Sequence, residues 1–438
     1  MQARSPRIKQ LAHKRQWGSH ESFASAYRTT AKELARETGN SALAASVLHR
    51  RTYDRWMSGG NTPRGVAAEI VCRMFELPLE MLFVAAGDDE PAGIPSSAGS
   101  ITLDDPLAIE NQLLRLAGGA LPDDVLTNFR HSVAGIVDRY EAEGPQRLAG
   151  EARMMRSTLH SMLTGQQLPA QRAELMRLTG RAAGLLAYMA VNSGKPEAAR
   201  AYCEEARTLA QWIGDVELEI WALGTLSLCL YYQGRYEDAN TAAAAGVELA
   251  PTNPQAIRLL SNGQARALAK LGRTDEAHAA LQRAYDLSDK HHIPGGLTPC
   301  IAFQPYSLAR TLANAMTVHL SLNETSRVFG FGDEIRGVVH RSGSEWSRAL
   351  VTLDIATAYL QDEHPDVEQA MALGVQALEA ARTAPISSVW NRAADLYETA
   401  NGDNRWHGSR EVREYAEHLR LWKSLPPVTQ LATRALTV

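Results

Sequence analysis

The feature that most constrains this chain is a pattern of two helices that occurs three times near its centre. The copies begin GLLAYMAVNSG, GTLSLCLYYQG and GQARALAKLG; each has an apolar helix, a turn glycine, and a second helix with an alanine five residues after the glycine. The turn glycines Gly194, Gly234 and Gly272 are 40 and 38 residues apart. Such turns need a residue that tolerates positive φ, and closely crossing helices need small residues. The small residues at these predicted crossings are Ala187, Ala199, Ser227, Ala239, Ala265 and Ala277.

Helical periodicity extends over the remainder of the chain from Pro106 onward, and no strand pair is expected there. Further helix pairs are expected over 306–340 and 345–384, and 122–176 supplies earlier helices, either as divergent repeats or as a dimerisation bundle. A single pair cannot bury its own apolar face, so the pairs should stack into a solenoid with a concave inner surface. The alternative is an irregular helical bundle without a superhelix. The repeated unit resembles the tetratricopeptide repeat, a helix-turn-helix of about 34 residues.

Charge is distributed unevenly, although the net charge of the whole chain is only −4. Residues 1–64 contain 12 Lys and Arg against four acidic residues, a net charge of +8; extending the count to residue 83 gives +6 and leaves −10 for the remainder. A basic head on an acidic body indicates that the head binds a polyanion. The alternative is a small domain that is basic without such a partner.

The composition also suggests where the chain folds. It contains four cysteines without a CxxC pair, which favours reduced, buried thiols over a zinc module or a disulfide framework. Residues 1–17 are basic but lack an apolar segment, and no run reaches the roughly 18 apolar residues of a membrane span. We therefore expect a cytoplasmic protein with no membrane partner.

The basic head contains a candidate recognition helix within LAASVLHRRTYDRWMSG, residues 43–59. Leu48, Tyr53 and Trp56 lie about one face, and Gly59 with Gly60 ends the helix. The opposite, polar face carries Arg50, Arg51, Thr52 and Arg55. An amphipathic helix precedes this stretch, and two short helices follow it.

This order resembles the helix-turn-helix domain of the phage-repressor-like, or xenobiotic-response-element-like, regulators. The resemblance implies that helix 49–58 enters the major groove of double-stranded DNA. Arg50 and Arg51 would then contact guanine bases, and Thr52 a thymine methyl group. Phosphate contacts are expected from Arg55, Lys14, Arg28 and Lys32. The alternative is that these arginines form a solvated face with no role in DNA binding.

The fold class expected for the chain is therefore all-α, with an N-terminal helix-turn-helix domain followed by a tetratricopeptide-like α-solenoid. The expected domains are 1–86 for DNA binding, 87–105 as a polar linker, and 106–438 for sensing and dimerisation. This combination resembles the peptide-sensing quorum regulators and a group of actinomycete regulators of development and antibiotic production. The resemblance implies a homodimeric regulator that binds operator DNA and responds to a peptide, a small signal molecule or a protein partner.

In tetratricopeptide-like repeats the first helix of each pair forms the inner face. Amide and aromatic side chains there suit a peptide or a small amphipathic ligand, because carboxamides pair with peptide groups and aromatic rings supply rigid apolar area. The alternative is that most of these side chains pack between repeats. Phasing on the turn glycines predicts as ligand-binding residues Arg181, Tyr188, Asn192, Trp221, Tyr231, Tyr232, Asn262, Arg266, Arg310 and Asn314.

Nothing in the sequence predicts an enzyme. The motifs GxxxxGK[ST], GxGxxG, GxSxG and HExxH are absent, and we assign no catalytic residue, no cofactor and no metal site, including at His291, His292 and Cys300. Two other functions stay open. One is a protein-interaction scaffold with a vestigial head that does not bind DNA, since Met57 stands where the regulator family usually has an acid. The other is a modulator of a kinase or phosphatase.

Overall fold

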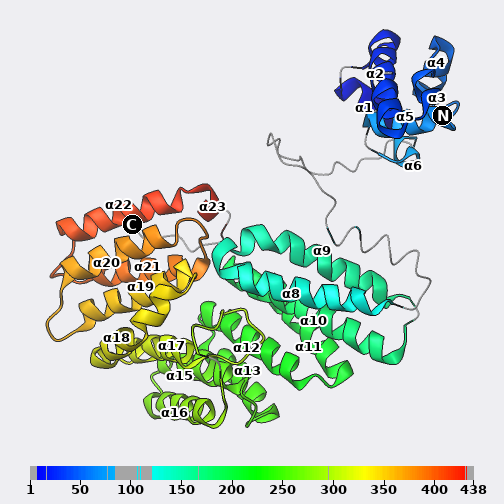
Figure 1. The fold of residues 1–438 in the computed structure, drawn as a ribbon. Helices are drawn as coiled ribbons and strands as arrows, with labels where there is room; N and C mark the ends of the chain where they lie inside the picture. The colour runs from blue at the N-terminus through cyan, green and yellow to red at the C-terminus, as the bar shows by residue number, and fades with distance from the viewer. Residues whose placement is uncertain are drawn as a thin grey trace, which may run out of the picture. The chain divides into compact units, whose positions relative to one another are not determined.

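The computed structural model describes residues 7–15, 17–75, 77–83, 106, 109, 121–165, 167–293, 295–429 and 431. Regular structure within these ranges is helical throughout and includes no strand, so the all-α expectation is confirmed for them (Figure 1). The chain divides into two compact units, Met1–Thr102 and Leu103–Val438. The predicted linker, residues 87–105, lies outside the described residues. No helix in the described ranges has the length and apolar character needed to cross a membrane.

The N-terminal unit is a small helical domain around one aromatic core. Phe23 and Tyr27 from its longest helix pack with Trp56, Ile70 and Phe75, all of which are buried. The described helices of this unit are α1 (Arg7–Lys14), α2 (His20–Thr38), α3 (Ser41–Ala44), α4 (Arg50–Met57), α5 (Val66–Phe75) and α6 (Leu79–Leu82).

Local signals set the ends of α2. Ser19 and Ser22 form a reciprocal capping box at its start, which satisfies two backbone N–H groups that the helix leaves free. Gly39 ends it with φ 71°, a conformation that costs glycine little. Asn40 then caps the start of α3, so α3 follows α2 directly along the chain.

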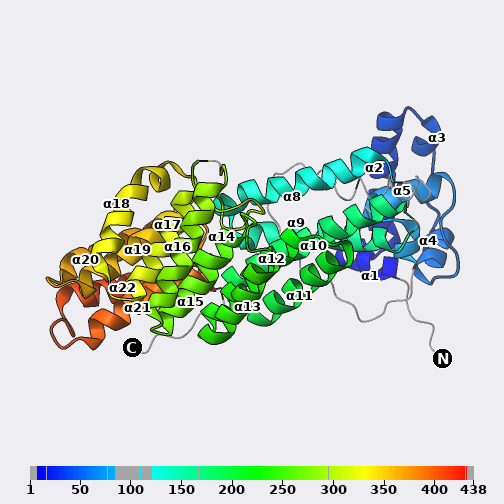
Figure 2. The same cartoon turned by 90° about the horizontal axis from the view of Figure 1, so that it is seen from below.

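The C-terminal unit is an array of helices, viewed in Figure 1 and from below in Figure 2. Its described elements are α8 (Asp123–Glu143), α9 (Pro145–Leu163), α10 (Pro169–Asn192), α11 (Pro196–Ile213), α12 (Val216–Tyr232), α13 (Tyr236–Leu249), α14 (Ala256–Arg258), the π-helix η1 (Leu259–Gln264), α15 (Ala265–Lys270), α16 (Thr274–Lys290), α17 (Leu308–Ser321), α18 (Thr325–Arg341), α19 (Glu345–Gln361), α20 (Val367–Ala380), α21 (Ser387–Gly402), α22 (Arg410–Lys423) and α23 (Pro426–Thr429).

Successive helices pair and the pairs stack. Helix α10 packs on α11, α12 on α13, α15 on α16, α17 on α18, and α19 on α20. The first helices of neighbouring pairs also touch one another, from α10 to α12, through η1 and α15 to α17, and on to α19 and α21. This is the arrangement of stacked helical hairpins, and the expected helix pairs over 306–340 and 345–384 correspond to α17 with α18 and α19 with α20.

The three predicted turn glycines have the predicted conformation. Gly194, Gly234 and Gly272 have φ values of 68°, 73° and 72°. The six small residues predicted at helix crossings are each fully buried. Close packing of the hairpins therefore depends on the residues that the repeated pattern singled out.

The array curls back so that its early helices touch its late ones. Helix α8 contacts α19, and α10 contacts α21. Gln146 Nε2 donates to the Pro385 carbonyl at 3.1 Å, and Ser387 Oγ donates to the Val191 carbonyl at 3.1 Å. One hydrophobic core includes residues from both ends of the array. The segment 122–176 is thus part of the closed array, where α8 and α9 pack on α10.

Candidate functional sites

The first candidate site is the exposed face of α4 in the N-terminal unit. Arg50 and Arg51 are exposed in the first turn, and Thr52 is half-buried. The opposite face is anchored, since Trp56 is 3% exposed and the Tyr53 hydroxyl donates to the Gly18 carbonyl at 2.8 Å. The predicted amphipathic arrangement of this helix is therefore what the structure shows.

The basic residues predicted around α4 are available to a partner. Among the described residues, no carboxylate lies within ion-pair distance of Arg50, Arg51 or Arg55. The same holds, within those ranges, for the exposed Lys14, Arg28 and Lys32 of α1 and α2, both of which contact α4. By contrast, Arg15 and Arg73, two other cations of this unit, contact partners within it.

Arg73 and Arg15 contact other elements of the N-terminal unit. Arg73 pairs with Glu37 at 3.3 Å. Arg15 donates to the Met74 carbonyl and lies 5.5 Å from the ring centroids of Trp17 and Phe75. These contacts tie α1, α2 and α5 together, so Arg15 and Arg73 stabilise the unit while the α4 arginines face solvent.

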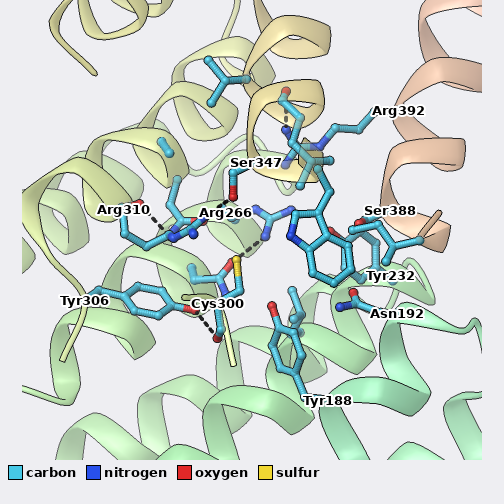
Figure 3. Close-up of a pocket in the computed structure, with 18 of the residues that line it drawn as sticks. Tyr188, Asn192, Tyr232, Arg266, Cys300, Tyr306, Arg310, Ser347, Ser388 and Arg392 are labelled. Carbon is cyan, nitrogen blue, oxygen red and sulfur yellow. Dashed lines mark hydrogen bonds between the residues drawn. The ribbon is translucent and has the colours of Figure 1, made fainter. Parts of the chain in front are cut away.

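The second candidate site lies on the inner surface of the repeat unit, where two cavities share lining residues. Figure 3 shows the lining of the narrower cavity. The narrow cavity has a volume of about 60 Å³ and the wide cavity about 610 Å³. Tyr232, Arg266 and Arg392 line both of them. Since protein pockets for small ligands generally measure about 300–1,000 Å³, the wide cavity has the size of a ligand site.

Most of the predicted ligand-binding residues meet at these cavities. Tyr231 lines the wide cavity. The predicted residues that line the narrow cavity are Tyr188, Asn192, Tyr232, Asn262, Arg266, Arg310 and Asn314.

Two predicted residues, Trp221 and Arg181, line neither cavity, and both contact Phe303. The segment 295–307 folds over them: Trp221 Nε1 donates to the Ala302 carbonyl at 2.8 Å, and its ring lies 4.7 Å from that of Phe303. The Arg181 guanidinium stacks on the same Phe303 ring at 5.4 Å. A loop that the sequence marks only as a connection thus covers this part of the inner face.

Several lining residues were missed by the sequence analysis. They belong to α8, α19, α21 and the segment 295–307, and those of α8 and α21 come together because the array closes on itself. No signal in the repeat phasing identifies them. The missed residues of the narrow cavity include Tyr140, Cys300, Tyr306, Trp346, Ser347, Ser388 and Arg392.

Two buried ion pairs hold the cavity wall. Arg310 donates to Glu141 at 3.0 Å, and also to the Thr298 carbonyl at 2.7 Å. Arg392 pairs with Asp354 at 2.6 Å. The first pair joins α17 to the distant α8, and the second joins α21 to α19, the first helix of the neighbouring pair.

Arg266 is the buried cation at the junction of the two cavities. The π-helix η1 immediately precedes it and carries Asn262, whose side-chain oxygen accepts a 2.5 Å hydrogen bond from Arg266. The guanidinium lies 4.3 Å from the ring centroid of Tyr231. Burial lowers the pKa of Arg266, but nearby Tyr231, Tyr232 and Asp354 outweigh that effect, so the net pKa is above its ordinary value. Single π-helical turns occur often at functional sites.

The Cys300 thiol shares the narrow cavity with these groups. Burial raises its pKa to about 11, so the thiol stays protonated at neutral pH. A protonated thiol is a poor nucleophile. Cys300 therefore supplies apolar surface to the cavity wall.

His278, His319 and Glu324 form a group of metal-ligand residue types within the described chain. His278 Nε2 donates to the Glu324 carboxylate at 3.1 Å, and His319 Nδ1 donates to the same oxygen. The three side chains satisfy one another and link α16, α17 and α18. The sequence analysis did not identify this group, because its members come together only through the stacking of the hairpins.

Comparison with known proteins adds little to this geometry. No protein-family model matches the chain, and no curated protein matches it. Among solved structures, the crystal structure of the P58(IPK) TPR domain is similar at 15% sequence identity; the match covers 72% of this chain and 96% of that chain, with a TM-score of 0.21.

Proposed function

We propose that this protein is a cytoplasmic transcriptional regulator that binds operator DNA through α4 and senses a peptide or a small signal molecule through the repeat unit. The observation that carries the proposal is the exposed face of α4. Arg50, Arg51 and Arg55 project from a helix whose other face is fixed in the core by Tyr53 and Trp56.

An α-helix fits the major groove, where guanine offers two acceptors to one guanidinium. Arg50 and Arg51 stand in the first turn of α4, the part of a recognition helix that meets base edges. Lys14, Arg28, Lys32 and Arg55 would contact phosphates, which fix the position of the domain without reading sequence. The resemblance of the head to the phage-repressor-like regulators supports these roles.

The repeat unit supports the sensing half of the proposal. Its inner surface has a cavity of ligand size, with amide, phenol and guanidinium groups along its walls. The resemblance to tetratricopeptide-containing quorum regulators supports a peptide or small-molecule signal, and supports a homodimer that places two heads on one operator.

The test is selection of random duplex DNA by the full-length protein, with the affinity of the enriched sequence measured across salt concentration. The expected result is an enriched two-fold site whose affinity falls steeply with salt. The Arg50→Ala/Arg51→Ala variant should lose the sequence preference and keep its circular dichroism spectrum. A matched variant, Arg413→Ala/Arg420→Ala, removes two exposed arginines from α22 and should bind as the wild type does.

Two results would contradict the proposal. If the Arg50/Arg51 variant retains the preference for the enriched site, α4 is not the reading helix. If the wild-type protein enriches no sequence and shows no salt-dependent affinity, the protein-interaction scaffold becomes the better explanation.

A further inference from the structure

Two arginines on the inner helices are buried without a carboxylate partner among the described residues: Arg258, 2% exposed, and Arg266, 3% exposed. Their neighbours Arg310 and Arg392 each pair with an acid. A buried charge without a counter-ion is costly, because the interior solvates it poorly. The presence of two such cations therefore needs a physical explanation.

The surroundings of Arg258 provide that explanation. Its guanidinium lies 4.5 Å from the ring centroid of Trp221 and within 5.8 Å of those of Tyr188 and Tyr306. It also donates to Thr225 Oγ1 at 2.8 Å. Aromatic faces attract a cation, and Arg258 lines neither cavity. Arg258 is a packing residue enclosed by protein.

Arg266 differs because it borders open space. It lines both cavities, and in Figure 3 its guanidinium projects among the side chains that surround the narrow one. Asn262 and Tyr231 contact it from one side, but its Nε–H is buried with no acceptor. Asp354, an acid whose charge influences Arg266, is engaged by Arg392. Arg266 thus has an unused donor where a ligand would lie, and no carboxylate of the described residues forms an ion pair with it.

The remaining lining indicates what kind of anion fits. Asp395 and Glu398 line the wide cavity together with Lys270 and Arg266, so its walls carry charges of both signs. Such walls disfavour a polyanion such as a nucleotide and suit a zwitterion. A planar guanidinium matches a carboxylate, and the side-chain amides of the inner surface match peptide groups.

We propose that Arg266 binds the C-terminal carboxylate of a short peptide lying in the wide cavity. This inference rests on the proposed sensing function of the repeat unit and names the chemistry of its ligand. The carboxylate would replace the counter-ion that Arg266 lacks, and Asn262 would orient the guanidinium toward it.

The experiment uses the full-length protein and two libraries of random pentapeptides without Asp or Glu, one with free C-terminal carboxylates and one with C-terminal amides. Peptides retained by the protein are identified by mass spectrometry, and their affinities as acid and as amide are measured by calorimetry. The variants are Arg266→Gln, Arg266→Lys and the matched control Arg420→Gln, which removes an exposed arginine of α22 that lines neither cavity. Thermal unfolding checks that each variant is folded.

The proposal expects the acid form to bind wild type at least tenfold more tightly than the amide. This preference should vanish in Arg266→Gln, weaken in Arg266→Lys, and persist in Arg420→Gln. If Arg266→Gln does not fold, the Arg266→Lys result decides. Equal binding of acid and amide, an acid preference that survives in the Arg266 variants, or retention of no peptide would each overturn the proposal. The DNA selection is independent of these results, so failure here is distinguishable from failure of the regulator function.

Discussion

The guanidinium of Arg310 in α17 donates a 3.0 Å hydrogen bond to the carboxylate of Glu141 in α8, 169 residues earlier in the chain. Both side chains are buried, and the same carboxylate oxygen accepts a 2.7 Å hydrogen bond from the Cys300 backbone. The carboxylate of α8 therefore holds both α17 and the segment that leads into it. This junction closes the repeat array around the cavities.

Glu141→Gln tests that junction. The substitution leaves Arg310 buried without its counter-ion, and removing one partner of a buried pair costs about 3–5 kcal/mol. We expect the urea midpoint of the repeat unit to fall accordingly. The control is Glu143→Gln, two residues away, because Glu143 forms a solvent-accessible pair with Arg139 whose loss should cost under about 1 kcal/mol. Equal midpoints for the two variants would show that the junction does not stabilise the fold.

Gly263→Ala tests the packing at η1. A Cβ at this position would lie 2.6 Å from the Cβ of Ala243, which cannot rotate away. Overpacking of this kind costs about 1–3 kcal/mol. Gly150→Ala in α9 is the control, since a Cβ there meets no atom within 4 Å and alanine favours a helix by about 1 kcal/mol. The midpoint of thermal unfolding should fall for Gly263→Ala and rise for Gly150→Ala. A Gly263→Ala variant that is more stable than the wild type would contradict the packing described for η1.

Trp56→Ala tests whether the head folds as an independent unit. Truncating a buried tryptophan costs about 3–5 kcal/mol, enough to unfold a small domain. Limited proteolysis should remove the head of this variant and leave the repeat unit intact. The neighbouring Arg55→Ala variant should resist proteolysis as the wild type does. Its DNA affinity should fall, and that affinity should depend less on salt concentration, by about the amount expected for one lost phosphate contact. Protection of the Trp56→Ala head would show that this side chain is not its anchor.

A dependence of stability on pH follows from His319 and Glu324. Burial lowers the pKa of His319 below its ordinary 6.5. The pKa of Glu324 is also lowered, because burial, which raises it, is outweighed by hydrogen bonds from His319 and His278. Both shifts favour the deprotonated forms in the folded state, so the stability they contribute is present at neutral pH and is lost as pH falls.

Thermal midpoints measured from about pH 7.5 to about pH 5.5 should therefore decrease, since the unfolded histidine takes up a proton across this range. The variant His319→Gln should show a smaller decrease. His131→Gln, which removes an exposed histidine of α8, should behave as the wild type does. A repeat unit that is equally stable across this range would contradict the buried state of His319.

The sequence predicted features that depend on neighbouring residues. The turn glycine Gly234 and the buried Ala239 follow from local rules of helix termination and crossing, and both have the predicted geometry. Inner-face residues such as Asn262 and Arg266 were also predicted, because phasing on a turn fixes which face of a helix points inward. The amphipathic character of α4 is another local property, and Trp56 is buried as expected.

The features that were missed depend on contacts between distant segments. The closure through Glu141 and Arg310 has no periodic signature, and neither does the fold of the segment 295–307 over Trp221. For that reason Trp221 was predicted as a ligand-binding residue although Phe303 covers it. The pairing of Arg392 with Asp354 likewise arises only once α21 and α19 are stacked.

Contacts between α8 and α19, and between α10 and α21, join the early helices of the repeat unit to its late ones. An open solenoid changes its curvature gradually, through small adjustments spread over many hairpins. A solenoid whose ends are joined can alter its curvature only after the join at α8–α19 and α10–α21 gives way. We therefore expect any large change in the curvature of the repeat unit to break the contacts between α8 and α19 and between α10 and α21.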